Sequence, residues 1–407
     1  MLITSKRLVL ISIILASFLC SYNRLMGATI FSQSCSQSDV EAAISLATEG
    51  DVVVVPSGTC NWSGLSFSNK AITLRGAGIS STIINLSGTI EMGDSIGARL
   101  TGLRLNDNNG DSFNMIHVAG HKFRIDHCYF YNSASSYLDV ISVDRRDLSV
   151  TGRPYGVIDS CKFEGMRIVV NTYYNFWDIN KAWYNDTLGL GDERAVYVED
   201  CIFDNSLYGI SCIDGNRGGA YVFRFNDVEH SYIEAHSLQN DQERAIRRWE
   251  IYGNNITNNG TAIYYPFRIR GGTGIIFSNT ISGAWTNIGI AFDNVRDITS
   301  VGNAGLCDGN SLWDKNETGE SGWWCRDQIG TSTDTSLWTE ENPHPEQTRV
   351  PAYVWNNTYN GSEVSVDEIN KGDFDHIQSD RDYYKLSTNF DGTSGIGVGP
   401  LSSRPDT

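Results

Sequence analysis

The chain has 407 residues, with 40 glycines but only 8 prolines, and its 48 acidic side chains outnumber 31 basic ones for a net charge of −17. Such an acidic chain is poorly suited to nucleic acid or to an anionic membrane surface. It also disfavours simple charge attraction to an acidic polysaccharide, unless basic side chains gather locally or a bound cation such as Ca²⁺ bridges the two.

The first residues have the order of a secretory signal. Lys6 and Arg7 precede an apolar run from Leu8 to Leu19. This predicts a signal peptide over residues 1–28, cleaved after Ala28, and a secreted or cell-surface protein. A lipoprotein modified at Cys20 and an uncleaved anchor are the alternatives. No later stretch is apolar enough to span a membrane, so we expect no membrane insertion of the mature chain.

Nine cysteines are present, and export permits disulfides. Cys35–Cys60 and Cys307–Cys325 are the expected pairs, because each lies in an irregular, loop-like stretch. No CxxC or histidine-rich spacing indicates zinc.

A short helix is expected before the first strand. Ser38 can cap it, Glu41 can complete a capping box, and Gly50 ends it. Its apolar stripe is Val40, Ala43, Ile44 and Ala47. A helix here would cover the open end of a stack of strands, whose first strand is expected at Val52–Val55.

One eight-residue pattern recurs along the chain: apolar, any, apolar, any, any, slot, any, apolar. We call its sixth position the slot. The pattern is clearest at Tyr221-Phe223-Asn226-Val228 and is repeated around Asn254 and Asn279, although Gly274 fills the first position of the last copy poorly. The slot residues are Ala77, Leu103, Cys128, Cys161, Cys201, Asn226, Asn254, Asn279 and Asn357. The shortest step between slots is 25 residues, which indicates a solenoid with one slot in each coil.

Stacking explains the slot. Coils rise by the strand spacing of about 4.8 Å, so identical positions lie above one another. Asparagines can then form a ladder of amides. The three cysteines are expected to be stacked, buried thiols rather than redox or metal-binding groups.

The helix-capped start with VVVVPSG and ITLRGAG, followed by the asparagine stack, resembles the pectin-lyase-like superfamily of secreted right-handed parallel β-helices. GGAYVFRFN, RRWEIYGN, FRIRGGTG, CRDQIG and YVWNN carry the likeness further. The resemblance implies an all-β solenoid in one domain over residues 29–360, with a loop insertion at about 305–348. Residues 361–407 are expected to form an irregular, truncated end. These motifs are specific for the fold and weak for function.

Alternation along the strand after each slot indicates which side chains face outward. Ile233 and Ala235 should point inward, so Glu234 and His236 should point out. By the same parity Arg268, Arg270, Asp293, Asp139 and Arg167 are outward candidates, with Tyr264 as a further substrate-binding candidate. Stacked coils would gather these side chains into a groove for an extended polysaccharide or other glycan.

Two reactions and one non-catalytic role fit such a groove. β-Elimination from a uronic-acid polysaccharide needs a neutralised carboxylate and a base, for which His236 has a suitable ordinary pKa. The resemblance implies Arg268 and Arg270 as base or carboxylate clamp, with Ca²⁺ as another way to neutralise the substrate. Glycoside hydrolysis needs paired carboxylates, which the sequence does not place together. A non-catalytic adhesive or filament-forming protein is the remaining alternative, in which the arginines only pair with acids on neighbouring coils.

Overall fold

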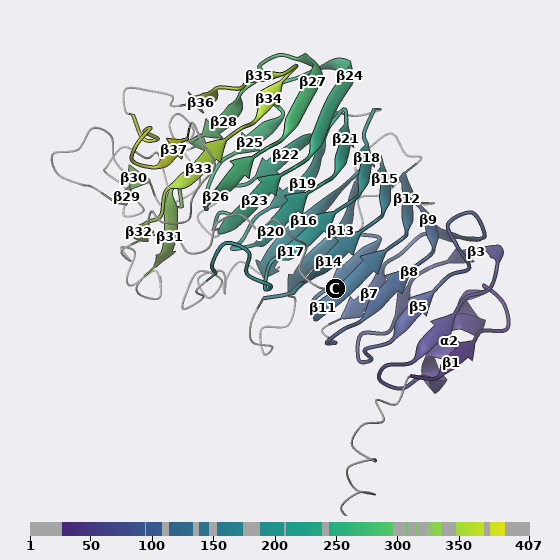
Figure 1. Ribbon diagram of the computed structural model, residues 1–407. Helices are drawn as coiled ribbons and strands as arrows, with labels where there is room; N and C mark the ends of the chain where they lie inside the picture. The colour runs from purple at the N-terminus through teal and green to yellow at the C-terminus, as the bar shows by residue number, and fades with distance from the viewer. Residues whose placement is uncertain are drawn as a thin grey trace, which may run out of the picture.

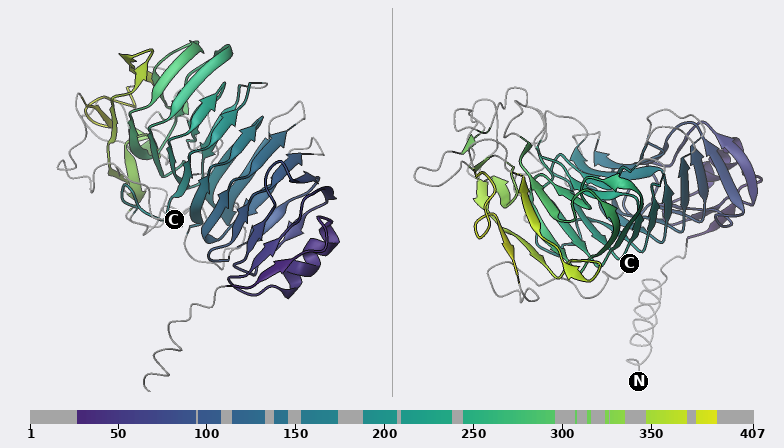
Figure 2. Two further views of the ribbon diagram at one scale, coloured as in Figure 1. Left: turned by 45° about the vertical axis from the view of Figure 1, so that its right-hand side comes forward. Right: turned by 90° about the horizontal axis from the view of Figure 1, so that it is seen from above.

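The computed structural model describes residues 27–93, 95–107, 114–132, 138–145, 153–173, 188–206, 209–237, 244–295, 307, 314–315, 324–325, 327–334, 347–369 and 375–386. Three long sheets of stacked strands, sheets A, B and C, run the length of the molecule, from the purple N-terminal end to the yellow end (Figures 1 and 2). Each coil contributes one strand to each sheet in turn, which confirms the predicted parallel β-helix. The predicted signal peptide falls almost entirely outside the described residues.

Sheet A contains β1 (Thr29–Phe31), β2 (Val52–Val54), β5 (Thr73–Arg75), β8 (Arg99–Thr101), β11 (His121–Asp126), β14 (Tyr155–Asp159), β17 (Val196–Glu199), β20 (Ala220–Arg224), β23 (Arg248–Tyr252), β26 (Thr273–Phe277), β33 (Ala352–Trp355) and β37 (Tyr383–Lys385). Sheet B contains β3 (Gly58–Trp62), β6 (Thr82–Leu86), β9 (Arg104–Asp107), β12 (Tyr129–Asn132), β15 (Lys162–Glu164), β18 (Ile202–Asp204), β21 (Asp227–Glu229), β24 (Asn255–Ile263), β27 (Thr280–Trp285), β34 (Thr358–Tyr359) and β35 (Ser362–Glu363).

Sheet C contains β4 (Leu65–Ser66), β7 (Ile90–Gly93), β10 (Ile116–Val118), β13 (Leu138–Arg145), β16 (Met166–Tyr173), β19 (Ser211–Gly215), β22 (Tyr232–Ala235), β25 (Phe267–Ile269), β28 (Ile290–Asp293) and β36 (Val366–Ile369). Two short antiparallel pairs lie in the predicted insertion: β29 (Asp314–Lys315) with β30 (Trp324–Cys325), and β31 (Thr331–Asp334) with β32 (Gln347–Arg349). The described part of the chain contains no helix with the length and hydropathy of a membrane span.

The N-terminal end is covered by α2 (Gln37–Leu46), which lies against β1 to β4 (Figure 2). Its predicted apolar stripe is buried, but the predicted cap is wrong: Ser36, not Ser38, accepts the hydrogen bond from the Asp39 backbone N–H. Ser36 and Asp39 have the same three-residue spacing as the expected pair, so the pattern fits both registers. The disulfide Cys35–Cys60 joins the start of this helix to β3, as predicted.

The corner between sheets A and B repeats one backbone conformation. The residue before the slot has a left-handed φ in coil after coil, for example 52° at His127, 55° at Phe225 and 53° at Ser278. This conformation disfavours residues with a Cβ, so neighbouring contacts must hold it in place. The slot side chain of the next coil supplies such a contact. Oδ1 of Asn254 accepts a hydrogen bond at 3.0 Å from the backbone N–H of Asn226, the residue after Phe225.

The slot asparagines form the predicted ladder. Nδ2 of Asn226 donates to Asn254 at 3.1 Å, Asn254 to Asn279 at 2.9 Å, and Asn279 to Asn357 at 2.8 Å. Cys128, Cys161 and Cys201 are buried free thiols in the same column, and burial followed by the two neighbouring thiols raises the pKa of Cys161. The ladder therefore ties successive coils together inside the core.

Gly274 occupies an apolar position for a steric reason. It pairs in register with Trp249, and a Cβ at Gly274 would lie 1.7 Å from the Trp249 carbonyl oxygen. The same Cβ would lie 2.6 Å from Cε3 of the buried Trp249 ring, so glycine leaves space for both the backbone and the ring.

Two expectations differ from the structure. Ala77 and Ile79 are exposed, because β5 ends at Arg75 and β6 starts only at Thr82, so the intervening residues form a surface turn. Beyond residue 360, where an irregular end is expected, β36 and β37 still extend sheets C and A. In both places the spacing between strands departs from the repeat, and a periodic sequence pattern cannot predict the length of such connections.

We predict that Asn254→Ala lowers the free energy of unfolding by roughly 2 to 4 kcal/mol, because it leaves buried donors on Asn226 without an acceptor. Urea denaturation followed by circular dichroism measures the change. The neighbouring exposed Asn255 is the control, and Asn255→Ala should change the value by less than about 0.5 kcal/mol. Equal effects of the two substitutions would show that the ladder does not hold the coils together.

Candidate functional site

Most of the predicted site residues lie on the outer face of sheet C. Asp214 on β19, Glu234 on β22 and Arg268 on β25 are in-register neighbours on adjacent strands (Figure 1). Ile233 and Ala235, on either side of Glu234, belong to the hydrophobic core. Glu234 therefore faces away from the core, as the alternation predicts.

Glu234 is held by arginines from the next coil. Arg270 Nη2 donates to its Oε1 at 2.7 Å, and Arg268 Nη1 lies 3.8 Å from the same oxygen. Arg268 also donates to Asp293 Oδ2 at 3.3 Å. Glu234, Arg270 and Asp293 are each less than 5 % exposed, whereas the Arg268 side chain is 36 % exposed. The expected open column is thus largely closed, and Arg268 is its main contact with solvent.

Arg167 connects charged residues of the earlier coils to those around Glu234. Its Nε donates to Asp139 Oδ1 on the preceding strand, and its Nη1 lies 3.4 Å from Asp214 Oδ2. Asp139 and Arg167 are in-register neighbours of β13 and β16. Arg167 therefore links Asp139 to Asp214, which is the neighbour of Glu234 in the sheet.

Asp214 is a central residue that the sequence analysis missed. Its Oδ1 lies 2.5 Å from His236 Nδ1, and no described residue bonds the other ring nitrogen, Nε2. Asp214 is buried, while the His236 side chain is 15 % exposed. Applying the alternation rule to β19 would have found Asp214, since the preceding Ile213 is in the core. The charged cluster consists of Asp139, Arg167, Asp214, Glu234, His236, Arg268, Arg270 and Asp293.

The cluster keeps its charges by mutual pairing. Burial alone would raise the pKa of Asp214, but His236, Arg167 and Arg270 outweigh burial and hold it below its usual range. Burial likewise acts to lower the pKa of Arg167, and Asp214 and Asp139 more than compensate, so this pKa is raised. Four carboxylates therefore face three guanidiniums, and the ring of His236 lies against one of the carboxylates, Asp214.

Tyr264, the remaining predicted residue, lies at the corner between sheets B and C. It is 55 % exposed and lines, together with Arg268, a cavity of about 370 Å³. The cavity therefore opens beside the exposed end of the charged cluster.

One trio in the cluster has the composition of a cation site. Ligand atoms of Asp214, Glu234 and His236 lie within 4.8 Å of one another. Calcium prefers six to eight oxygen ligands, however, and here one donor is a ring nitrogen. Glu234 Oε1 already accepts from Arg270, and Asp214 Oδ1 contacts His236. The trio fits Ca²⁺ poorly, because a cation would have to displace a guanidinium.

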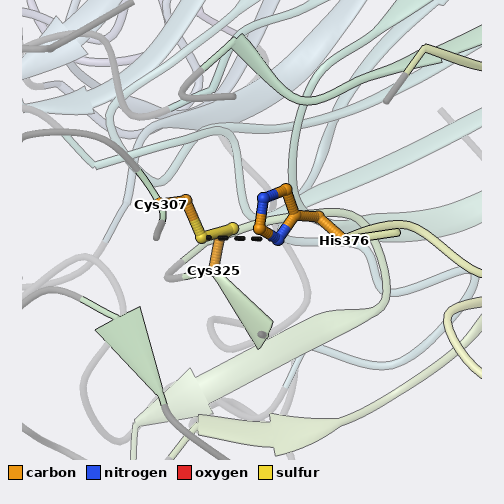
Figure 3. Close-up of side chains that lie close together, drawn as sticks. All are labelled: Cys307, Cys325 and His376. Carbon is orange, nitrogen blue, oxygen red and sulfur yellow. Dashed lines mark hydrogen bonds between the residues drawn. A yellow bond between two sulfur atoms is a disulfide. The ribbon is translucent and has the colours of Figure 1, made fainter. Parts of the chain in front are cut away.

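A second trio, Cys307, Cys325 and His376, is structural. The two cysteines form the predicted disulfide, and His376 Nδ1 lies 3.8 Å from Cys307 Sγ (Figure 3). All three residues are buried. The disulfide therefore joins two positions within the insertion, His376 lies against it, and its sulfurs are not available as thiolate ligands.

Another histidine on sheet C has a contrasting environment. His117 on β10 contacts Glu91 through Nδ1 at 2.5 Å and Asp144 through Nε2 at 3.1 Å. Burial acts to lower its pKa, but the hydrogen bonds to Asp144 and Glu91 prevail and raise the pKa to about 9. His117 is therefore protonated at neutral pH and bound at both nitrogens.

Comparison of the sequence with protein-family models and with curated proteins finds no match. Among solved structures, the chain is similar to the PL6 family polysaccharide lyase Pedsa3628 from Pseudopedobacter saltans, with 12 % identity, 83 % of this chain and 77 % of that chain covered, and a TM-score of 0.40. It is also similar to the PL6 family alginate lyase AlyGC, with 14 % identity and a TM-score of 0.40. That match covers 92 % of this chain and 56 % of AlyGC. Likeness at this level carries no argument about activity.

We predict that His117 makes stability depend on pH. Because its folded pKa is raised to about 9, its contribution is complete below pH 6.5 and is lost as the pH rises through 9. The shift corresponds to roughly 3 kcal/mol. The difference in free energy of unfolding between wild type and His117→Gln should therefore shrink by about this amount from pH 6 to pH 10. A difference that does not change with pH would contradict the charged assignment.

Proposed function

We propose that the protein is a secreted lyase that cleaves an acidic polysaccharide by β-elimination at a uronate unit. The observation that carries this proposal is the Asp214–His236 pair, which lies on the outer face of sheet C in the same charged cluster as the solvent-exposed Arg268. A base and an anion-binding group are two of the elements that β-elimination requires.

His236 serves as the base. Its Nδ1–H donates to Asp214, which fixes the tautomer and leaves the lone pair of Nε2 to accept a proton. In the proposed reaction Nε2 removes the proton from C5 of the uronate, next to the carboxylate. Asp214 then stabilises the imidazolium that forms, because its carboxylate stays ionised.

Arg268 binds the uronate carboxylate. Removing the C5 proton pushes negative charge onto that carboxylate, and a guanidinium in place lowers the energy of this charge. Arg270 is less suited to this role, because it is buried and donates to Glu234. We therefore assign Arg270, with Glu234, to positioning Arg268.

The electron pair left at C5 forms the C4–C5 double bond and expels the oxygen at C4, which must be protonated. Tyr232 lines the cavity together with Arg268. Burial, followed by the charge of Glu234, raises the pKa of Tyr232 to about 12, so its hydroxyl keeps its proton at neutral pH. Tyr232 is our choice for the acid that protonates the leaving oxygen.

Hydrolysis is less compatible with this cluster. A glycosidase needs one carboxylic acid with a raised pKa next to a second free carboxylate. The pKa of Asp214 is lowered, and Glu234 is bound by arginines. The pair lies close together, but neither member has the environment of a proton donor.

Secretion is supported by the two disulfides, since such bonds persist in oxidising compartments. A non-catalytic glycan-binding protein remains the alternative, and it predicts binding of acidic polysaccharides without any turnover.

We expect wild-type protein to generate the ultraviolet absorbance of an unsaturated uronate from at least one acidic polysaccharide, and His236→Gln to lower kcat at least about 100-fold. His127, which contacts Asp126 at a corner of sheet A, provides the control His127→Gln, with unchanged kcat. A folded wild-type protein that releases no unsaturated product from a panel of such polymers would refute the lyase.

Arg268→Gln should reduce kcat/KM about 10- to 100-fold, the effect of losing one charge-assisted contact. The wild-type activity should survive a calcium chelator, because a guanidinium rather than a metal ion neutralises the substrate. Restoration of Arg268→Gln by added Ca²⁺, or loss of wild-type activity with the chelator, would instead assign this role to a metal.

A further inference from the structure

The cavity beside Arg268 is formed by a local departure from the coil pattern. Between Asn258 and Ile263 the register of β24 with β27 shifts, so that Asn259, Gly260, Thr261 and Ala262 lie opposite Ala284 alone. Extra residues at one corner of a regular solenoid must bulge outward. Thr261, Ala262 and Tyr264 are accordingly exposed.

Hydrogen bonds hold this bulge in one shape. Asn258 accepts from the Gly260 N–H at 3.0 Å and donates to the Thr261 carbonyl at 3.1 Å. Asn259 donates from its backbone and its side chain to Glu229 on the preceding coil, at 2.9 and 3.1 Å. The bulge is therefore a formed wall, and a pre-formed pocket binds with less ordering cost than a flexible one.

The walls of the cavity have the chemistry of a sugar site. The lining side chains include three tyrosines, a histidine and an arginine: Tyr232, Tyr264, Tyr265, His230 and Arg268. Gly209 also lines the cavity and has no side chain to fill it. A Cβ at Gly209 would meet His230 Nε2 at 3.1 Å. Exposed aromatic rings stack on sugar faces, while hydroxyl and guanidinium groups bind their oxygens. The volume of about 370 Å³ lies at the low end of ligand pockets, which suits one monosaccharide unit.

Arg268 retains donors for an anion. A guanidinium has five N–H donors. Among the described residues only Asp293 accepts a hydrogen bond from Arg268, at 3.3 Å, and its buried Nε has no partner. The remaining Nη donors of this side chain, which is 36 % exposed, can bind a carboxylate at the edge of the cavity, where Tyr264 supplies a ring face.

We propose that this corner cavity is a binding site for a single uronate ring, with the carboxylate on Arg268 and one sugar face against Tyr264. The inference rests on the proposed function, since it locates the sugar whose carboxylate Arg268 neutralises. To the carboxylate contact that the charged cluster provides, it adds recognition of the sugar ring by Tyr264 at the corner between sheets B and C.

The test uses free galacturonate and glucuronate as probes, with galactose and glucose as neutral counterparts, titrated into the full-length protein and followed by calorimetry or ligand-observed NMR. We expect a uronate to bind at least tenfold more tightly than its neutral counterpart. Ala262→Trp, which places an indole at the cavity mouth, should weaken uronate binding at least tenfold. Tyr264→Ala should weaken it several-fold.

Matched controls come from the opposite end of the solenoid. Ala77→Trp adds an indole at another exposed alanine, and Phe31→Ala removes another exposed aromatic ring, so neither should change uronate binding. Circular dichroism confirms that each variant is folded. Equal binding of uronate and neutral sugar, equal binding by Ala262→Trp and wild type, or no uronate binding at all would overturn the assignment of the cavity.

Polymer cleavage by the same proteins separates the two proposals. A wild type that binds uronate through Ala262 and Tyr264 but cleaves no polymer supports the cavity and refutes the lyase. A wild type that cleaves polymer, with Ala262→Trp unchanged in both cleavage and uronate binding, supports the lyase and overturns the cavity.

Discussion

Parallel, in-register pairing of successive coils is the constraint on which the rest of this structure depends. It places equivalent residues about 4.8 Å apart along the solenoid. In the core, this spacing lets each slot asparagine bond the next one and supports the left-handed backbone corner beside the asparagine ladder. A shift of one residue in any coil would turn its apolar side chains outward and break the ladder, so the register is strongly specified.

The same register creates an electrostatic problem on the outer face of sheet C. Asp214 and Glu234 are direct neighbours on adjacent strands, and both are buried. Two like charges at this spacing are unfavourable unless cations lie beside them. Arg167 and Arg270 supply those cations from the coils on either side. Buried ion pairs seldom stabilise a fold better than apolar packing, so a gain in stability alone does not account for the cluster.

The sequence predicts well whatever repeats with the coil. The slot positions, both disulfides and the parity of Glu234 and Arg268 follow from the period or from the irregular stretches between coils. It predicts poorly what depends on how neighbouring segments cover a surface. Parity places Glu234 and Arg270 on the outer face, but it cannot show that both are buried there. The cavity arises from extra residues at one corner of β24, and these follow no period.

Two histidines on sheet C differ in how their ring nitrogens are bound. His117 is bound by carboxylates at both ring nitrogens, and its pKa is raised to about 9, so at neutral pH it has no lone pair with which to accept a proton. His236 contacts a carboxylate through Nδ1 alone, and arginines compensate the charge of that carboxylate. No described residue bonds its Nε2. The coils place both histidines along one sheet, and the proposed reaction uses His236 because Arg268, the proposed anion-binding group, lies in the next coil.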